Sequence, residues 1–159
     1  SCAMIAEMTA YVKDQGMSLY DFLLDTYEQF GLYRESLVSL TKKGKSGVEE
    51  IRQMMRDLRE NPPKTIVGEQ VTTVIDYLEG TETDVASGTQ RPIEFPESNV
   101  LQFFTEKGTK VSARPSGTEP KIKFYFSVNG QLSDQSGFSQ EWNALGDKID
   151  SVIDDMKLK

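Results

Sequence analysis

Apolar side chains recur every three or four positions in four stretches of the chain, which is the spacing of an amphipathic helix. A serine opens three of these stretches, as expected for an N-terminal cap. In two of them an acidic residue, Asp21 or Glu49, follows three positions later and completes a capping box. Helices are therefore predicted over residues 2–15, from Ser18 to Gly31, from Ser46 to Asn61 and from Ser139 to Met156.

The remaining apolar positions predict β-strands. The clearest alternation lies at 121–128, where Ile122, Phe124, Phe126 and Val128 share one side and polar residues share the other. Residues 79–98 are acidic and contain glycine and proline, so they are predicted to form a long surface loop. The expected strands are 32–41, 64–78 with a break at Gly68, 100–104, 110–114 and 121–128.

This order of elements favours an α+β fold. An antiparallel sheet is expected to carry the later helices on one face and to leave its other face free. The two helices at the start of the chain precede this sheet.

Composition excludes several kinds of chemistry. The 159 residues contain no histidine, so a Ser-His-Asp triad, a Cys-His pair and a histidine-ligated zinc are all absent. The single cysteine, Cys2, forms neither an internal disulfide nor a CxxC site, and low cysteine use favours the cytoplasm. No apolar run spans a bilayer. The net charge of −7 argues against nucleic acid and anionic membranes as partners, so an anion site would have to be a local basic exception.

Such an exception lies in the loop between the last two predicted strands, Arg114-Pro115-Ser116-Gly117-Thr118-Glu119-Pro120. Arg114 offers a planar fork of donors that matches two phosphate oxygens. Ser116 and Thr118 carry hydroxyl donors, and Gly117 allows a tight turn and close approach of a ligand to the backbone. Successive backbone N–H groups in such a turn are expected to form an anion-binding concavity. Lys123, on the free side of the next strand, reaches the same anion.

Simpler explanations exist for each of these residues. Proline, serine, glycine and threonine are also ordinary turn residues. The basic turn at Lys42, Lys43 and Lys45 lacks the first glycine of a phosphate-binding P-loop and is interpreted as a solvated turn. Tyr125 either stacks on a ligand or is an ordinary exposed sheet tyrosine. Glu119 would repel a phosphate unless it points away or accepts hydrogen bonds from sugar hydroxyls.

The segment RPSGTEPKIKFY, residues 114–125, resembles the C-terminal phosphate-binding loop of the α-D-phosphohexomutases, the phosphoglucomutase/phosphomannomutase superfamily. The resemblance extends over essentially the whole chain. It implies that residues 1–34 are the helical end of a preceding domain with a linker. Residues 35–159 would then be the TATA-binding-protein-like C-terminal domain. Arg114, Ser116, Gly117, Thr118 and Lys123 match the positions that hold the substrate phosphate.

The resemblance implies a parent enzyme that interconverts hexose 1-phosphate and 6-phosphate through a phosphoserine, a magnesium ion and a bisphosphate intermediate. The family's serine loop (TASHNP), metal loop (DGDxDR) and sugar-reading loop (GEES) do not occur in this sequence. The chain by itself is therefore expected to be catalytically inactive and to hold no cofactor. Magnesium would belong to the rest of the parent enzyme.

Expected partners are a phosphosugar and the remaining domains of the parent enzyme. Residues 2–15 would expose an apolar stripe of Met4, Ile5, Met8 and Val12, which is expected to drive self-association. The alternative is a non-enzymatic interaction module with the same fold, in which the free sheet face meets a protein. Nucleic-acid binding through the lysine-rich strands is disfavoured by the charge balance. The identity of the sugar is left open.

Overall fold

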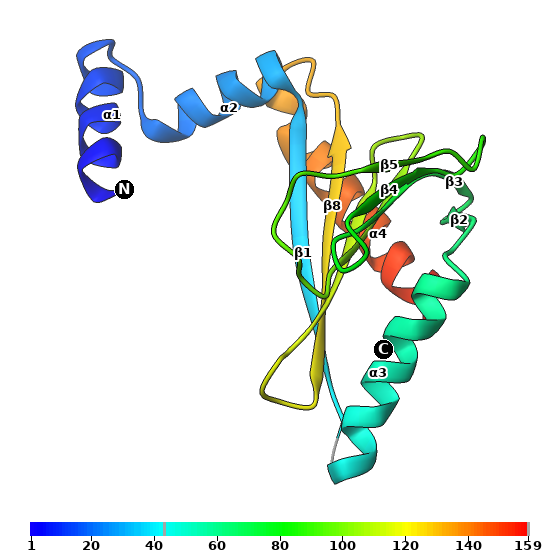
Figure 1. The fold of residues 1–159 in the computed structure, drawn as a ribbon. Helices are drawn as coiled ribbons and strands as arrows, with labels where there is room; N and C mark the ends of the chain where they lie inside the picture. Colours follow the sequence, from blue (N-terminus) through cyan, green and yellow to red (C-terminus); the bar gives the residue numbers. More distant parts are fainter. Residues whose placement is uncertain (43, 159) are drawn as a thin grey trace. The chain divides into compact units, whose positions relative to one another are not determined.

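The computed structural model describes residues 1–42 and 44–158. Within them the chain is an α+β structure with four α-helices and an eight-stranded antiparallel sheet (Figure 1). The helices are α1 (Cys2–Asp14), α2 (Leu19–Phe30), α3 (Gly44–Glu60) and α4 (Phe138–Asp155), with a short 3₁₀ helix η1 (Gln135–Gly137) before the last. The strands are β1 (Leu32–Thr41), β2 (Thr65–Ile66), β3 (Glu69–Asp76), β4 (Thr81–Asp84), β5 (Gln90–Pro92), β6 (Leu101–Thr105), β7 (Lys110–Pro115) and β8 (Lys121–Gly130).

The chain divides into two compact units. Unit 1 consists of Ser1–Arg34 and Asn129–Gly146, and unit 2 consists of Glu35–Val128 and Asp147–Lys159. Each unit is described by itself below.

Unit 1 contains α1, α2, η1 and the start of α4. The predicted caps of the first two helices are confirmed: Gly16 has a φ of +77°, and Ser18 and Asp21 form a capping box. Gly16 and Met17 donate their backbone N–H groups to the carbonyls of Lys13 and Val12, which is a Schellman motif. α2 packs on the start of α4 through aromatic rings, with Tyr27 and Phe138 stacked at 6.1 Å.

Unit 2 contains the main body of the sheet, in the strand order β1-β8-β7-β6-β3-β4-β5 with β2 beside β3. The alternation predicted at 121–128 is confirmed, because Ile122, Phe124, Phe126 and Val128 are all buried. These side chains form one face of the sheet with Leu101, Phe103, Val111 and Ala113, which are completely buried. Burial of apolar area on this face is the main stabilising contribution to the unit.

Both helices of unit 2 contact this same buried face. Asp76 lies opposite the buried Leu101 in the strand register and forms an ion pair with Arg59 of α3. Glu69 accepts a hydrogen bond from the Thr105 hydroxyl and forms an ion pair with Lys148 of α4. Thr105 lies two positions from Phe103, on the same side of β6. The opposite face of β6, β7 and β8, which carries Gln102, Ser112 and Tyr125, is therefore the helix-free face, as the sequence predicted.

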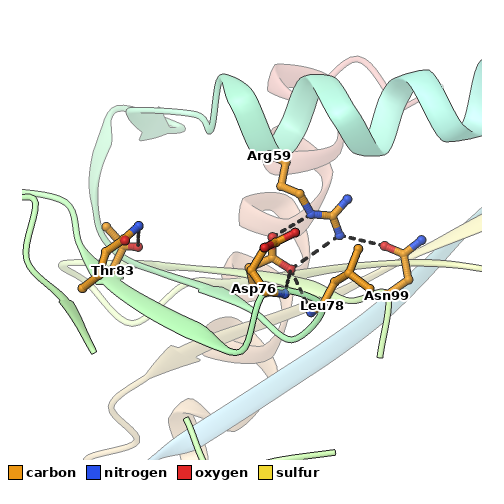
Figure 2. A network of polar contacts seen from close by, with 7 residues as sticks. Arg59, Asp76, Leu78, Thr83 and Asn99 are labelled. Carbon is orange, nitrogen blue, oxygen red and sulfur yellow. Dashed lines mark hydrogen bonds and ion pairs between the residues drawn. The ribbon is translucent and has the colours of Figure 1, made fainter. Parts of the chain in front are cut away.

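A polar network ties the end of α3 to the sheet (Figure 2). The Arg59 guanidinium donates to both carboxylate oxygens of Asp76, at 2.6 and 3.5 Å, and to the Asn99 side-chain oxygen at 2.7 Å. Asp76 also accepts the backbone N–H groups of Leu78 at 2.9 Å and Glu79 at 3.4 Å. The side chains of Arg59 and Asp76 are only 19% and 10% exposed, so this ion pair is largely shielded from water.

Two predicted helix starts are wrong. α3 begins at Gly44, so Ser46 lies in its first turn, and Glu49 binds Arg56 at 2.6 Å and Arg52 at 3.7 Å instead of completing a capping box. α4 begins at Phe138, so Ser139 does not precede it. Asp134 instead caps the preceding 3₁₀ turn by accepting the Ser136 N–H at 2.6 Å. Both predictions rest on the preference of serine for the cap position, but serine is also tolerated inside a first turn.

The predicted long loop at 79–98 is also partly wrong, because it contains the hairpin of β4 and β5. Asp84 and Ser87 close this hairpin with hydrogen bonds of 2.8 Å. The hairpin lies at the edge of the sheet and most of its side chains are polar, so it lacks the apolar alternation that marks a strand. Lys43, in the basic turn that was predicted to be solvated, lies outside the described residues.

Candidate phosphate site

The candidate site lies where β7 turns into β8, in unit 2. The turn is closed by two backbone hydrogen bonds of 2.8 Å, from Ser116 N–H to the Lys121 carbonyl and from Lys121 N–H to the Glu119 carbonyl. Pro115 ends β7, and its fixed φ stiffens the entry to the loop. The two strands therefore hold a short, defined loop at their common end.

The strand register places Arg114 directly opposite Lys123. Both side chains lie on the helix-free face, because Ala113 and Phe124 beside them are buried on the other. Together they border a hollow of about 260 Å³, called the basic hollow here, lined by Arg114, Pro115, Ser116, Gly117, Lys121, Lys123 and Tyr125. Four of the five predicted residues thus line one hollow, namely Arg114, Ser116, Gly117 and Lys123.

The positive charge of this pair is not balanced by an ion pair within the part of the chain that the structure describes. Among residues 1–42 and 44–158, no carboxylate forms an ion pair with Arg114 or Lys123. Like charges directly opposite each other on neighbouring strands are destabilising. An anion in the basic hollow would remove this repulsion, so the pair favours anion binding.

Glu119 does not face the basic hollow. Its carboxylate lies 2.5 Å from the Lys121 Nζ, and it borders a different hollow together with residues of α3. The hydrogen bond and charge of Lys121, with a smaller contribution from Lys123, hold the pKa of Glu119 below its ordinary value. Glu119 therefore stays ionised and neutralises Lys121, which leaves Arg114 and Lys123 as the unpaired charges of the site.

The Ser116 hydroxyl organises the loop from within. Its oxygen accepts the backbone N–H groups of Thr118 at 3.4 Å and Glu119 at 3.3 Å. These two successive amides therefore converge on one oxygen, that of Ser116. Both distances are long for a hydrogen bond, so a stronger acceptor such as phosphate competes well for the same donors.

Thr118 is the one predicted residue that does not line the basic hollow. It lines a different hollow of about 300 Å³, which Ser116 and Gly117 share and which residues of α3 border. The sequence could not place Thr118, because the side to which a loop side chain points depends on the loop dihedrals and not on strand alternation.

Gly117 also differs from its prediction. Its φ is not in the left-handed region, and a Cβ added to it would meet no atom within 4 Å. The turn itself therefore does not require glycine. Of the two roles predicted for Gly117, a tight turn and the close approach of a ligand to the backbone, only the second remains.

Three residues of the basic hollow, Pro115, Lys121 and Tyr125, were not among the predicted site residues. Lys121 and Tyr125 follow the alternation of β8 and share the face of Lys123. This alternation was visible in the sequence and could have identified both. Neither a metal cluster nor a membrane helix occurs in the described part of the chain: no three acidic or cysteine side chains there could hold a metal ion, and no helix combines the length and apolar character needed to cross a bilayer.

Comparisons with known proteins give relatives of one kind. The chain is 35% identical over 126 residues to a phosphoglucomutase of Staphylococcus haemolyticus, a match that covers 79% of this chain and 23% of the relative. It is 34% identical over 142 residues to a phosphoglucomutase of Staphylococcus aureus, covering 89% of this chain and 25% of the relative. The chain is homologous to the C-terminal region of phosphoglucomutase. It spans about a quarter of the length of these curated relatives.

The comparison with solved structures also gives a phosphoglucomutase. The phosphoglucomutase parafusin of Paramecium, in its open form, aligns over 86% of this chain and 23% of its own, with a TM-score of 0.45 and 15% identity. No family model matches the chain. Homology to the phosphoglucomutases thus rests on the sequence relatives and confirms the resemblance found in residues 114–125.

Proposed function

We propose that this chain is the substrate-phosphate-binding domain of a phosphosugar mutase. The observation that supports the proposal is the like-charged pair of Arg114 and Lys123, which faces an open hollow and forms no ion pair with a carboxylate of the described residues. Arg114 would bind two phosphate oxygens through its planar fork, and Lys123 would add a point charge. The Ser116 hydroxyl and the amides that it now holds would supply further donors. Thr118 is the remaining candidate, and it would require a movement of the loop.

The parent reaction would be the interconversion of hexose 1-phosphate and hexose 6-phosphate through a phosphoserine and a bisphosphate intermediate. The names of the relatives favour glucose phosphates as substrates. In such a reaction this domain would position the phosphate that is not transferred. The magnesium ion would be held elsewhere in the parent, since the described residues offer no ligand cluster for it.

Three further properties belong to the same proposal. The chain by itself would turn over no phosphosugar, because it would supply only positioning and not the nucleophile or the metal. Its partners would be a phosphosugar and the remaining domains of the parent enzyme, in the cytoplasm. Nucleic acid and membranes would not be partners, in keeping with the net charge of −7.

A titration with inorganic phosphate and with glucose 6-phosphate, followed by the backbone amide signals, tests the phosphate site. The amides of residues 114–118 are expected to shift first, with about millimolar affinity, which corresponds to roughly 4 kcal/mol. Shifts centred on residues 42–46 would place the anion at the other basic turn and contradict the proposal. Mutase turnover by a preparation free of host enzyme would contradict the expected inactivity.

We also propose that α1 mediates self-association of this chain. Met4, Ile5 and Met8 are 75%, 53% and 39% exposed, so part of an apolar helix face meets water. The predicted exposure of Val12 is wrong, because Val12 is completely buried. Light scattering is expected to show dimers or larger species, and Ile5→Lys is expected to restore the monomer. Glu7→Lys, a charge change of similar kind in the same helix, serves as the control. A monomeric wild-type chain with α1 folded would overturn this proposal.

A further inference from the structure

The helix-free face of the sheet continues beyond the basic hollow as a row of polar side chains. Gln102 on β6 lies opposite Ser112 on β7, which in turn lies opposite Tyr125 on β8. Arg114 and Lys123 form the next row, two positions along the same strands. Two residues of a strand span about 7 Å, so the polar row begins about one sugar ring away from the two cations.

A second hollow covers this row. It has a volume of about 400 Å³ and is lined by Ser98, Val100, Gln102, Ser112, Arg114 and Tyr125. Arg114 and Tyr125 also line the basic hollow, so the two hollows adjoin at these side chains. A ligand held at the basic hollow by its phosphate therefore has a continuous concave surface on which the rest of the molecule can lie.

The hydrogen bonds within the row do not use all the donors of its side chains. The Tyr77 hydroxyl donates to the Gln102 Oε1 at 3.1 Å, and the Gln102 Nε2 donates to the Ser112 Oγ at 3.1 Å. Since the Ser112 oxygen already accepts a hydrogen bond, its own hydrogen is left to be donated. No acceptor for it occurs among residues 1–42 and 44–158, although Ser112 is only 7% exposed. Gln102 likewise retains a second amide hydrogen.

We infer that this row is a subsite for the hydroxyl groups of the sugar whose phosphate occupies the basic hollow. Arg114, at the edge shared with the basic hollow, is the only charged side chain that lines the second hollow, which suits a neutral ring better than a second phosphate. Ser112 and Gln102 would donate to sugar hydroxyl oxygens, and the Tyr125 ring would pack against the sugar. The subsite rests on the proposed function, because it takes its orientation from a phosphate at Arg114 and Lys123.

The test compares glucose 6-phosphate with inorganic phosphate in amide-signal titrations of the whole chain. Wild type is expected to bind glucose 6-phosphate about three- to tenfold more tightly than inorganic phosphate, the effect of one or two neutral hydrogen bonds. Ser112→Ala and Gln102→Ala are expected to abolish that difference and to leave the affinity for inorganic phosphate unchanged. Ser127→Ala, a serine on the same face in the row beyond, is the matched control and is expected to change neither.

The outcomes separate this inference from the proposed function. If inorganic phosphate does not shift residues 114–118, the proposed function fails and the subsite fails with it. If inorganic phosphate binds there but glucose 6-phosphate binds no more tightly, only the subsite is overturned. The Gln102 side-chain amide signal gives a readout on the wild-type protein, and it is expected to shift with glucose 6-phosphate and not with inorganic phosphate. That readout holds even where a variant at the buried Ser112 fails to fold.

Discussion

Two arginines of unit 2 sit in opposite electrostatic surroundings. Arg59 faces Asp76 at 2.6 Å on the helix-covered side of the sheet, and both oxygens of that carboxylate are engaged. Arg114 faces Lys123, a like charge, on the helix-free side, with no carboxylate in ion-pair distance among the described residues. The first arrangement is complete within the chain, whereas the second is completed only by solvent or an anion. The difference separates a charge cluster that stabilises the fold from one that we propose to bind a ligand.

Removing the acid of the complete cluster should have the largest effect. Asp76→Ala leaves the largely buried Arg59 guanidinium and the Leu78 N–H without their acceptor, and breaking such a pair costs about 3 kcal/mol. We expect urea unfolding to show a loss of this size in the free energy of unfolding, with phosphate binding by the folded protein unchanged. Glu49→Ala, which removes an exposed ion pair of α3, is the control and should cause little measurable loss. Equal losses in the two variants would contradict a special role of the Asp76 cluster.

Removing the arginine of the open pair should do the reverse. Arg114→Met keeps the length of the side chain but deletes a charge-assisted contact worth about 1.5–3 kcal/mol, so phosphate affinity should fall about 10- to 100-fold. The free energy of unfolding should stay constant or rise, because the repulsion from Lys123 is relieved. Lys110→Met, on the same strand and face but two rows away, is the control in both the titration and the unfolding experiment. A loss of stability in Arg114→Met without a loss of affinity would place Arg114 in the fold and not in a binding site.

A third charged cluster lies around Glu69, and its contribution to stability can be measured through the pH dependence of unfolding. Burial raises the pKa of Glu69, but hydrogen bonds from Lys148, Thr105 and Thr109 and the charge of Lys148 outweigh it, so the pKa lies below its ordinary value of 4.5. A carboxyl group with a depressed pKa in the folded state stabilises the protein above its unfolded pKa. That contribution is lost as the pH falls through the folded pKa.

The free energy of unfolding should therefore fall from about pH 4.5 downward, and Glu69→Gln should reduce that slope. Urea unfolding between pH 3 and pH 7 measures it. Glu60→Gln, an exposed position at the end of α3, is the control and should keep the wild-type slope. An unchanged slope in Glu69→Gln would mean that other carboxyl groups carry the acid sensitivity.

These clusters also mark how far the sequence predicts the structure. The pairing of Arg114 with Lys123 follows from two alternating strands and the short loop between them, since a short loop fixes the register. The ion pairs of Asp76 with Arg59 and of Glu69 with Lys148 join residues far apart in the chain. Their contact depends on how α3 and α4 pack on the sheet, which local periodicity does not determine.

Exposed elements were the least predictable. The edge strands β4 and β5 bury little apolar area, so no alternation distinguishes them from a loop. Thr118 lines a hollow other than the basic hollow, and its place depends on loop dihedrals that strand alternation does not determine. Strands with one buried face were predicted correctly because a shift of one residue would have exposed that entire face.

The smallest expected effect is that of a substitution at Gly117. It tests whether phosphate closely approaches the backbone of the loop. Its φ lies outside the left-handed region and a Cβ has open space, so Gly117→Ala should leave the free energy of unfolding unchanged or raise it by up to about 1 kcal/mol. Phosphate affinity should nevertheless fall a few-fold, because the new methyl group occupies the approach to the loop backbone. Gly88→Ala is the control: with a φ of +69° it should destabilise the protein and leave phosphate binding unchanged. If Gly117→Ala binds phosphate as wild type does, the anion is held by the side chains of Arg114 and Lys123 without close approach to the backbone.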